Sequence, residues 1–537
     1  MPEEAGANPP VEITRRVFIL VAALLCALSA LAPNATAAAF GEPVWTNVYN
    51  GEGYPFISRA PAVAVDGSGN VFVSGSSRGI VYDYATIKYS AAGTWLWARF
   101  FDRSDDYATA VAVDGSGNVF VTGYSGFAAS NYDYVTIKYS GTGDVKWTNV
   151  YNGLGNGADY ARAIAVDASG NVFVAGSSFN GTNSDYATVA YSGAGVPLWT
   201  NLYNGLGNSN DFATALALDG SGNVFVTGWS YGDANSYQNA TVAYSGAGVP
   251  LWTNRFGGPH VSYYTNAVSV AVDVSGNVFV AGESYNGANS DYATVAYSGV
   301  GVPLWTNLYN GLGNGDDSAR AIAVDASGNV FVTGYSYGAG SSYDYATVAY
   351  SGAGVPLWTN RYHWPPGRGD YARAIAVDGS GNVFVTGDSA GIIDPDYYLT
   401  DNYLTVAYSG AGVPLWTNRY IGRSATDSAT AIAVDGRGNV LVTGTSGIGY
   451  GTGFATIQYA GFNYNLPTIT QIMADNGEFQ FLFNAESNHA YTVEFRDFLD
   501  AGNWLTLTSI AAQPTATNII VTNAITNDAR FFRVRTP

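Results

Sequence analysis

This chain of 537 residues contains one cysteine, three histidines and two methionines, and only 12% of its residues are charged. The cysteine, Cys26, lies in an apolar N-terminal segment, so no disulfide can stabilise the fold downstream of it. Histidine and cysteine clusters with zinc-site spacing are absent, and so are the glycine-rich fingerprints of nucleotide-binding loops. These absences argue against a disulfide scaffold, a zinc enzyme and a nucleotide-dependent enzyme.

Basic residues are also scarce. The 22 lysines and arginines are outnumbered by 41 aspartates and glutamates, which gives a formal net charge of -19 at pH 7. A chain this acidic repels nucleic acids and anionic membrane surfaces. The partners that remain are cations, neutral glycans and protein surfaces, and we expect a monomer that binds no nucleic acid.

The first 39 residues are predicted to be a signal peptide. Arg15 and Arg16 precede an apolar run over residues 17–32, and an alanine-rich cleavage sequence follows at residues 35–39. The run is too short, and too closely followed by small residues, to favour a membrane-spanning helix. The two arginines suit a general secretory signal or a twin-arginine signal. We expect a secreted, periplasmic or cell-surface protein with no membrane span after signal removal.

One phrase recurs eight times between residues 65 and 442. It reads Val-Asp-x-Ser-Gly-Asn-Val-Phe-Val with few substitutions, and its copies are about 50 residues apart. In the copy at residues 159–203, period-two patterns and turn residues predict strands at 163–166, 172–176, 185–191 and 198–203. Four antiparallel strands in such a repeat are the size of a β-propeller blade, and the copies must pack on one another.

The two ends of the repeat array are complementary. Residues 42–49 contain a lone fourth strand with no blade before it, whereas the last repeat ends at residues 455–459 without a fourth strand. The N-terminal strand should complete the last blade, which closes the ring and removes exposed sheet edges. The sequence thus predicts an all-β fold with an eight-bladed β-propeller over residues 40–462, and seven blades is the alternative count.

After the propeller the pattern changes. Residues 463–467 are interpreted as a linker, and residues 468–537 alternate apolar and polar side chains with the period of a β-strand. Phe479, Phe481 and Phe483, for example, share one face. We expect a small C-terminal β-sandwich module here.

The repeated phrase V-D-x-S-G-N-V-F-V-T-G, followed by Y-A-T-V-A-Y-S, resembles the SBBP-type β-propeller repeats of bacteria. The resemblance implies a propeller in an exported protein but little chemistry, because most members have no defined activity. In the C-terminal region, A-Y-T-V-E-F, W-L and R-F-F-R-V resemble the fibronectin-like modules of secreted bacterial proteins.

The connections of each blade divide between two faces, because successive strands run in opposite directions. The Asp-x-Ser-Gly-Asn and Ser-Gly-Ala-Gly-Val-Pro turns lie on one face, the turn face, and are nearly invariant among the copies. The connections from second to third strand, and from fourth strand to the next blade, lie on the other face, the loop face, and vary. Binding residues usually sit on variable loops held by a rigid scaffold, so we expect the loop face to be functional.

Aspartates recur on both faces. The turn aspartates favour Asx-type turns over calcium ligation, because each turn offers one carboxylate. On the loop face, a second set precedes the first strand of its blade and is predicted either to cap backbone amides or to ring the channel mouth and bind calcium. This set is Asp106, Asp159, Asp211, Asp317, Asp370 and Asp427. Calcium is the one candidate cofactor, and the fold requires none.

Departures from the repeat in two blades supply four candidate catalytic residues. After the glycine of the second strand, only two copies carry an acid, Glu283 and Asp388. The two histidines of the propeller, His260 and His363, lie in the loops that enter the same two blades. Imidazole and carboxylate pairs can supply general acid–base chemistry, and two carboxylates can cleave a glycoside. Drift at loop positions is the alternative, because no catalytic motif brackets these residues.

Aromatic residues also gather in the variable loops. Amphipathic rings suit contact with sugars or protein surfaces, and ordinary packing would explain them as well. The candidate ligand-binding residues are Tyr263, Tyr264, Tyr285, Tyr337, Trp364, Tyr397 and Tyr398. We expect an exported binding or scaffolding protein with a glycan or protein ligand. The alternatives are an extracellular lyase or glycoside hydrolase and a purely structural cell-surface protein.

Overall fold

The structure is a computed structural model. It describes residues 40–51, 58–78, 81–126, 131–232, 236–257, 266–338, 342–364, 369–392, 399–422, 427–448, 451–461, 469–475, 478–485, 491–496, 505–511, 517–524 and 531–535. Within these residues the chain forms eight four-stranded antiparallel sheets, two three-stranded sheets and no helix. The signal peptide predicted at residues 1–39 and the linker predicted at 463–467 lie outside the described residues.

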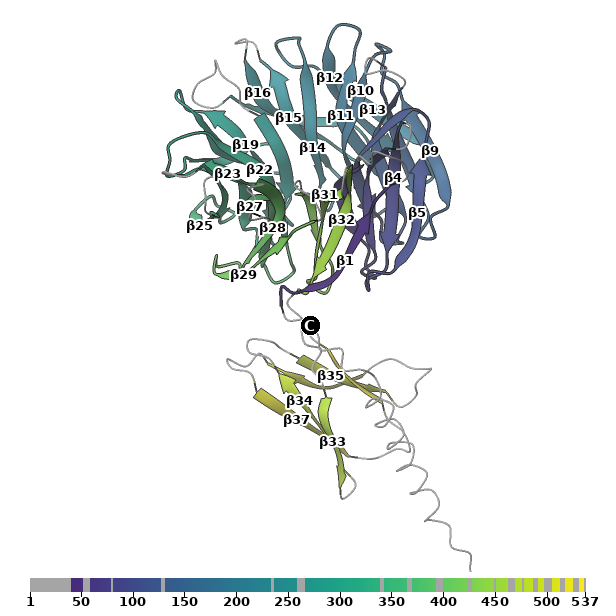
Figure 1. Cartoon of the computed structure of the whole chain (residues 1–537), viewed down its shortest axis with the longest axis vertical. Helices are drawn as coiled ribbons and strands as arrows, with labels where there is room; N and C mark the ends of the chain where they lie inside the picture. The colour runs from purple at the N-terminus through teal and green to yellow at the C-terminus, as the bar shows by residue number, and fades with distance from the viewer. Residues whose placement is uncertain are drawn as a thin grey trace, which may run out of the picture. The chain divides into compact units, whose positions relative to one another are not determined.

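Each four-stranded sheet is one blade of a β-propeller (Figure 1). The strands of blades 1 to 4 are β2 (Ser58–Val65), β3 (Val71–Arg78), β4 (Tyr82–Tyr89), β5 (Trp95–Phe101), β6 (Asp105–Val113), β7 (Val119–Gly126), β8 (Asp133–Tyr139), β9 (Val145–Tyr151), β10 (Asp159–Val166), β11 (Val172–Phe179), β12 (Ser184–Tyr191), β13 (Pro197–Tyr203), β14 (Asp211–Leu218), β15 (Val224–Tyr231), β16 (Tyr237–Tyr244) and β17 (Pro250–Phe256). Those of blades 5 to 7 are β18 (Asn266–Val272), β19 (Val278–Tyr285), β20 (Ser290–Tyr297), β21 (Pro303–Tyr309), β22 (Asp317–Val324), β23 (Val330–Tyr337), β24 (Tyr343–Tyr350), β25 (Pro356–Tyr362), β26 (Asp370–Val377), β27 (Val383–Ile392), β28 (Leu399–Tyr408) and β29 (Pro414–Tyr420). Blade 8 contains β30 (Ser428–Val434), β31 (Val440–Ile448), β32 (Gly451–Tyr459) and the N-terminal β1 (Pro43–Tyr49).

The first strand of every blade faces the axis of the ring. Each first strand contacts the first strands of both neighbouring blades, and β30 contacts β2, so the circle is complete. Small residues such as Ala163 and Ala165 of β10 suit this crowded position, where strands converge. The described residues therefore form eight blades, as predicted, and the alternative of seven is wrong.

The N-terminal strand closes the ring as the sequence predicts. β1 pairs with β32 from Pro43 to Tyr49 and becomes the outer strand of blade 8 (Figure 1). Asn47 and Trp45 then donate hydrogen bonds to carbonyl oxygens in blade 1, at 2.7 and 3.2 Å. On the opposite side, the Asn418 side chain of blade 7 donates to the carbonyl oxygen of Gly41. The segment that carries β1 is thus bonded to three blades.

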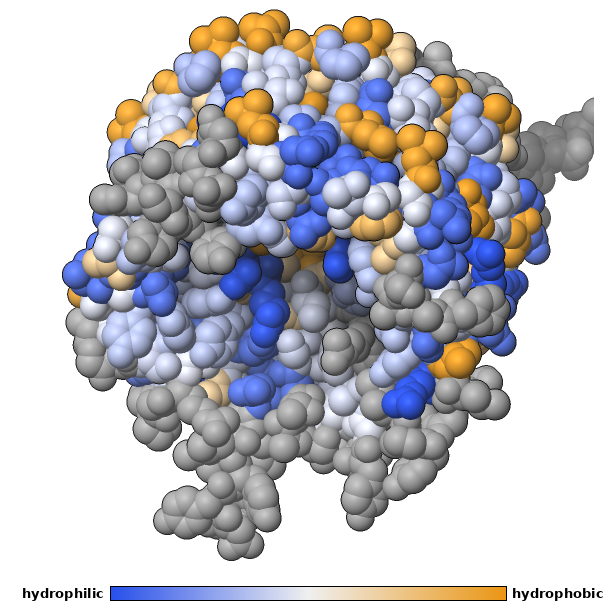
Figure 2. All heavy atoms as spheres, turned by 90° about the horizontal axis from the view of Figure 1, so that it is seen from above, coloured by the Kyte–Doolittle hydropathy of each residue, from blue (hydrophilic) through white to orange (hydrophobic). Residues whose placement is uncertain are grey.

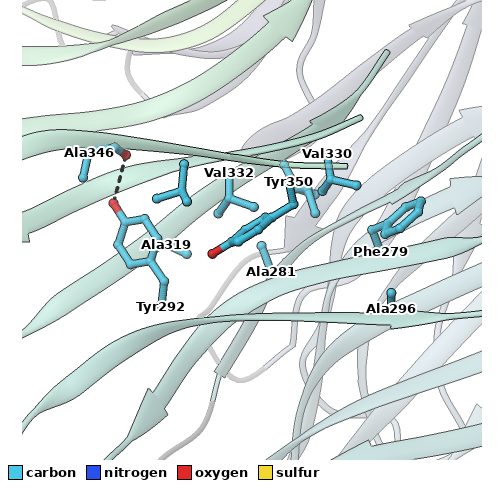
Figure 3. Close-up of a cluster of buried hydrophobic side chains, with 11 residues drawn as sticks. Phe279, Ala281, Tyr292, Ala296, Ala319, Val330, Val332, Ala346 and Tyr350 are labelled. Atoms are coloured by element: carbon cyan, nitrogen blue, oxygen red, sulfur yellow. Dashed lines mark hydrogen bonds between the residues drawn. The ribbon is translucent and has the colours of Figure 1, made fainter. Parts of the chain in front are cut away.

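The core lies between neighbouring blades. One cluster combines Phe279 and Tyr292 of blade 5 with Val332, Ala346 and Tyr350 of blade 6 (Figure 3). Equivalent clusters occupy the other interfaces, so a single repeat has no core of its own. Within this cluster the buried Tyr292 hydroxyl donates to the carbonyl oxygen of Ala346 at 3.1 Å.

Side chains of the outer strands also bind each blade to the next on the turn face. Trp199 and Asn201 of blade 3 donate to the carbonyl oxygens of Gly246 and Gly248 in blade 4, at 2.9 and 2.8 Å. A Cβ atom at Gly248 would lie 2.5 Å from the Trp199 ring, and its φ is +81°, so this turn needs glycine. These contacts recur around the ring, which explains why the turns vary so little.

Replacing Tyr292 with phenylalanine should lower the free energy of unfolding by about 1–2 kcal/mol. The change removes one buried hydrogen bond and leaves the Ala346 carbonyl oxygen without this donor. Tyr337→Phe is the matched control, because that side chain is 41% exposed and should change stability by less than about 0.5 kcal/mol. Urea denaturation of both variants measures the difference; equal values would contradict the role assigned to Tyr292.

The C-terminal module is a small β-sandwich, as predicted. One sheet contains β33 (Ile469–Asp475), β34 (Glu478–Ala485) and β37 (Thr517–Ala524), and the other contains β35 (Tyr491–Arg496), β36 (Leu505–Ile510) and β38 (Phe531–Arg535). Phe483 and Val521 of the first sheet pack on Val493 of the second. Its fibronectin-like character remains a prediction. Among the residues that the structure describes, none forms a helix of the length and apolarity needed to cross a membrane.

Candidate ligand-binding site

A β-bulge near the start of the first strand recurs in the blades. In β10 the pairing with β11 skips one residue between Ala161 and Ala163, so Arg162 stands out of the ladder. A bulge of this kind re-aims a side chain, and such bulges are frequent beside functional sites. The equivalent residues are Thr109, Thr214, Val268, Arg320, Arg373 and Thr430.

The second strand contributes a neighbouring position, directly after its glycine. The residues here are Ser76, Tyr124, Ser177, Trp229, Glu283, Tyr335, Asp388 and Thr445. Each pairs with a residue just before the bulge of the first strand, as Tyr124 does with Tyr107 and Trp229 with Phe212. The two positions together place one set of side chains from each blade beside the axis, toward the loop face.

Two cavities open among these side chains. The larger, of about 570 Å³, is lined by residues of blades 1 to 4: Pro61, Ser76, Tyr107, Ala108, Thr109, Tyr124, Arg162, Ser177, Phe212, Ala213, Thr214 and Trp229. The second, of about 440 Å³, shares Trp229 and Thr214 and extends to Glu283 and Arg320. Figure 2 shows a face of the propeller that is hollowed at its centre, with hydrophilic side chains in and around the hollow.

Aromatic rings form much of the wall of the larger cavity. Phe212 and Trp229 are stacked with their centroids 4.3 Å apart, and Tyr107 and Tyr124 are stacked at 5.2 Å. Tyr124 also meets Tyr160 edge to face at 5.0 Å. Because each ring is held by another ring, the wall is largely preformed.

The three bulge arginines differ in their partners. Arg320 lies 3.8 Å from the Glu283 carboxylate, and Arg373 donates to the Asp388 carboxylate at 2.6 Å. Arg162 instead lies over the rings of Tyr124 and Tyr160, at 5.8 and 5.7 Å from their centroids. Within the described part of the chain Arg162 has no ion-pair partner, so its guanidinium can donate to a ligand in the larger cavity.

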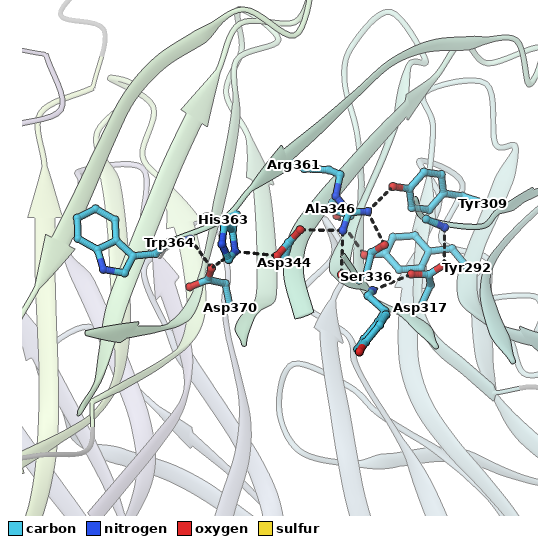
Figure 4. Close-up of polar contacts among 12 residues, drawn as sticks. Tyr292, Tyr309, Asp317, Ser336, Asp344, Ala346, Arg361, His363, Trp364 and Asp370 are labelled. Atoms are coloured by element: carbon cyan, nitrogen blue, oxygen red, sulfur yellow. Dashed lines mark hydrogen bonds and ion pairs between the residues drawn. The ribbon is translucent and has the colours of Figure 1, made fainter. Parts of the chain in front are cut away.

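The candidate catalytic residues do not form the expected pairs. His363 lies beside Asp344, with Nδ1 3.0 Å from a carboxylate oxygen, and 4.0 Å from Asp370 (Figure 4). Asp388 is buried against Arg373, and burial raises its pKa although the arginine opposes that shift. The expected His363–Asp388 pair is therefore wrong, because each residue is held by a different partner.

The other proposed pair cannot be followed, since His260 lies outside the described residues. Glu283 accepts a hydrogen bond from the Ser318 hydroxyl and faces Arg320. It borders the smaller cavity, which it shares with Trp229. A catalytic role for Glu283 remains a prediction.

The three candidate ligand-binding aromatics that the structure describes, Tyr285, Tyr337 and Trp364, do not line the larger cavity. Trp364 is 41% exposed and packs against the Arg419 guanidinium, 3.9 Å from its ring centroid, while Tyr337 packs edge to face on Tyr343. Tyr285 ends β19 and is half-buried. Tyr263, Tyr264, Tyr397 and Tyr398 lie outside the described residues.

The aromatic residues that do line the cavity lie in strands: Tyr107, Tyr124, Phe212 and Trp229. None of them is among the ligand-binding residues predicted from the sequence. A signal existed, because Tyr124 and Trp229 occupy the variable position after the second-strand glycine. What the sequence does not show is that this position and the bulge face the same space.

The first-strand aspartates are fully buried and accept hydrogen bonds from backbone amides. Asp159 accepts from Gly153 at 2.6 Å and from Phe179 at 3.0 Å. Asp211, Asp317 and Asp427 repeat this arrangement, while Asp106 and Asp370 accept from the loop before their strand. Burial raises the pKa of all six carboxyls. The expectation that they ring an open channel mouth is wrong, and amide capping accounts for their repetition.

The turn aspartates form the Asx-type turns that the sequence favours. Oδ1 of Asp167 accepts hydrogen bonds from the amides of Ser169 and Asn171, at 2.9 and 2.8 Å, and Oδ2 accepts one from the Asn171 side chain. The same bonds recur in the other repeats. These carboxylates are thus fully used within their own turns.

The comparisons with known proteins agree with the geometry of the propeller. Five segments match the SBBP family, a beta-propeller repeat: residues 101–127, 199–233, 305–340, 366–394 and 415–451. Solved structures that resemble the chain include a protein of unknown function from Bacteroides caccae, with 11% identity over 57% of this chain and 97% of that one, and a TM-score of 0.30. Others are a eukaryotic initiation factor, with 9% identity over 69% and 89% and a TM-score of 0.35, and the WD40 domain of SCAP from fission yeast, with 9% identity over 78% and 97% and a TM-score of 0.43.

No curated protein is similar enough in sequence to serve as a relative. Likenesses to structures as distant as these carry no inference about activity. The matched segments cover the first and second strands of five blades, numbers 2, 4, 6, 7 and 8, and each begins in the outer strand before them or in the loop that follows it. The propeller of this chain therefore contains β-propeller repeats of the SBBP family.

Proposed function

We propose that this chain is an exported binding protein that takes a neutral glycan in the larger cavity at the loop-face end of the channel. The observation that carries the proposal is the combination of stacked aromatic rings and one guanidinium without an ion-pair partner in a single cavity. A volume of about 570 Å³ suits one or two sugar rings, since ligand pockets commonly range from ~300 to ~1,000 Å³.

Sugar chemistry matches the wall of this cavity. The C–H faces of a sugar ring pack on aromatic rings such as Trp229, while its hydroxyl groups need hydrogen-bond partners. Arg162, Thr109, Thr214, Ser76 and Ser177 supply a guanidinium and hydroxyls on the same wall. The net charge of -19 opposes a polyanionic glycan, so we infer a neutral one.

Removing the Trp229 ring should weaken glycan binding by 10-fold or more, because aromatic anchors commonly contribute about 2 kcal/mol. The measurement is retention on a panel of neutral polysaccharides for wild type and Trp229→Ala. Trp364→Ala is the matched control, because that ring is exposed on the loop face but does not line the cavity. Arg162→Gln should also weaken binding, to a smaller degree.

Equal loss in Trp229→Ala and Trp364→Ala would contradict the cavity as the site. Binding that survives Trp229→Ala would point to the exposed loop aromatics selected from the sequence. Shortening of the retained polymer would instead indicate the lyase or hydrolase alternative. Absence of retention on every polymer would leave a protein ligand or a structural role.

A further inference from the structure

A cluster of three carboxylates lies at the junction between blades 1 and 2. Asp83 begins the third strand of blade 1, Asp102 follows the fourth, and Asp106 begins the first strand of blade 2. One carboxylate oxygen from each residue lies within 4.8 Å of the others. Two ligands of one calcium ion at about 2.4 Å are at most about 4.8 Å apart, so the three fit one coordination shell.

Two oxygens of the cluster have no hydrogen-bond donor. Asp106 is fully buried; its Oδ2 accepts from the amides of Arg103 and Ser104 at 2.7 and 3.3 Å. Its Oδ1 has no hydrogen-bond partner among the described residues, although the nearby Ser125 hydroxyl opposes the rise in pKa that burial causes. Oδ1 of Asp83 is likewise buried and without a partner. Burial and the charges of Asp102 and Asp106 raise the pKa of Asp83 to about 6.

Other junctions bring together the same two aspartates but add a neutral or positive partner. In blade 3, Asn180 donates to Asp185 at 2.8 Å. In blade 6, Arg361 donates to Asp344 at 2.9 Å and His363 lies on its other side (Figure 4). His363 occupies the sequence position of Asp102, directly after the fourth strand. The other blades have Asn50, Asn152, Asn204, Asn310, Gly257 and Ile421 there.

The blade 1–blade 2 junction thus has a third carboxylate at a position where none of its equivalents is acidic. Within the described ranges, no lysine or arginine lies within ion-pair distance of Asp83, Asp102 or Asp106. A hard cation would stabilise three carboxylates whose oxygens lie within 4.8 Å of one another and of which two have a buried oxygen without a donor.

We propose that Asp83, Asp102 and Asp106 bind one calcium ion. Calcium accepts irregular sets of oxygen ligands, and backbone carbonyls or water complete its shell, whereas magnesium demands a smaller, nearly ideal octahedron. The ion would fix the loop from β5 to β6 and the start of β6, which carries Tyr107 of the glycan cavity. The site itself does not depend on the glycan proposal.

The test compares wild type with Asp102→Asn, which gives this junction the residue found at four others. Asp102 is exposed in a loop, so the variant should fold. In millimolar calcium the melting temperature of wild type should rise by several degrees relative to chelator, and that of Asp102→Asn should not. In chelator Asp102→Asn should melt higher than wild type, because one repelling charge is gone.

Terbium provides a second readout, because Tyr84 lies near enough to Asp106 to sense its charge and can sensitise the emission; burial and the Asp106 carboxylate raise the pKa of Tyr84. Wild type should show emission that calcium displaces, and Asp102→Asn should show none. Asp316→Asn, which removes an exposed acid from another loop, is the control and should behave as wild type. A wild type that does not respond to calcium, an equal response in Asp102→Asn, or an equal response to magnesium would overturn the assignment.

Discussion

Deleting residues 40–50 should lower the free energy of unfolding by roughly 5 kcal/mol and make the chain associate through its open edge. The deletion removes the ladder between β1 and β32 and the buried Tyr49, which packs on Phe454 at 5.5 Å. It also removes the hydrogen bonds that Trp45 and Asn47 donate to blade 1. Denaturation and light scattering measure the two effects.

A chain that begins at residue 40 is the control for this deletion, since it lacks only the predicted signal peptide. Adding a peptide of residues 40–50 to the truncated protein should restore part of the stability by pairing with β32. A scrambled peptide should not. If the truncated protein kept its melting temperature and remained monomeric, closure by β1 would not stabilise the ring.

Much of the fold can be predicted from the sequence because its signals are local and repeated. The turn Asp167–Asn171 is specified by its own residues, and period-two patterns mark the strands on either side. Ring closure can be predicted because the two ends of the array are complementary. Residues 42–49 form a fourth strand with no blade before it, and the last repeat ends at residues 455–459 without a fourth strand. The same reasoning applies to any ring that is built from one repeated unit.

The candidate site is harder to predict because it depends on where strands from different blades meet. The sequence shows Tyr124 and Trp229 as departures from the repeat, but not the bulge that brings Arg162 beside them. Likewise, His363 and Asp388 belong to adjacent blades, yet one follows an outer strand and the other sits in a second strand near the axis. Sequence spacing does not measure that radial separation.

Replacing Asp317 with alanine should lower the free energy of unfolding by about 3 kcal/mol. The variant leaves the amides of Gly311 and Tyr337 without their charged acceptor, and each loss costs about 1.5 kcal/mol or more. Burial raises the pKa of the Asp317 carboxyl, so relief from desolvation offsets part of this cost.

Asp316→Ala is the matched control, because the neighbouring carboxylate is exposed and accepts only the Ser290 amide, at 3.0 Å. It should cost less than about 1 kcal/mol, and urea denaturation of the two variants gives the comparison. Equal losses would mean that amide capping does not explain why the first-strand aspartate recurs in six blades. A larger loss for Asp317→Ala would show that amide capping stabilises the junctions in which both carboxylate oxygens have donors. Among the six first-strand aspartates, and within the described residues, only Asp106 has an oxygen without a donor, and that oxygen belongs to the proposed calcium site.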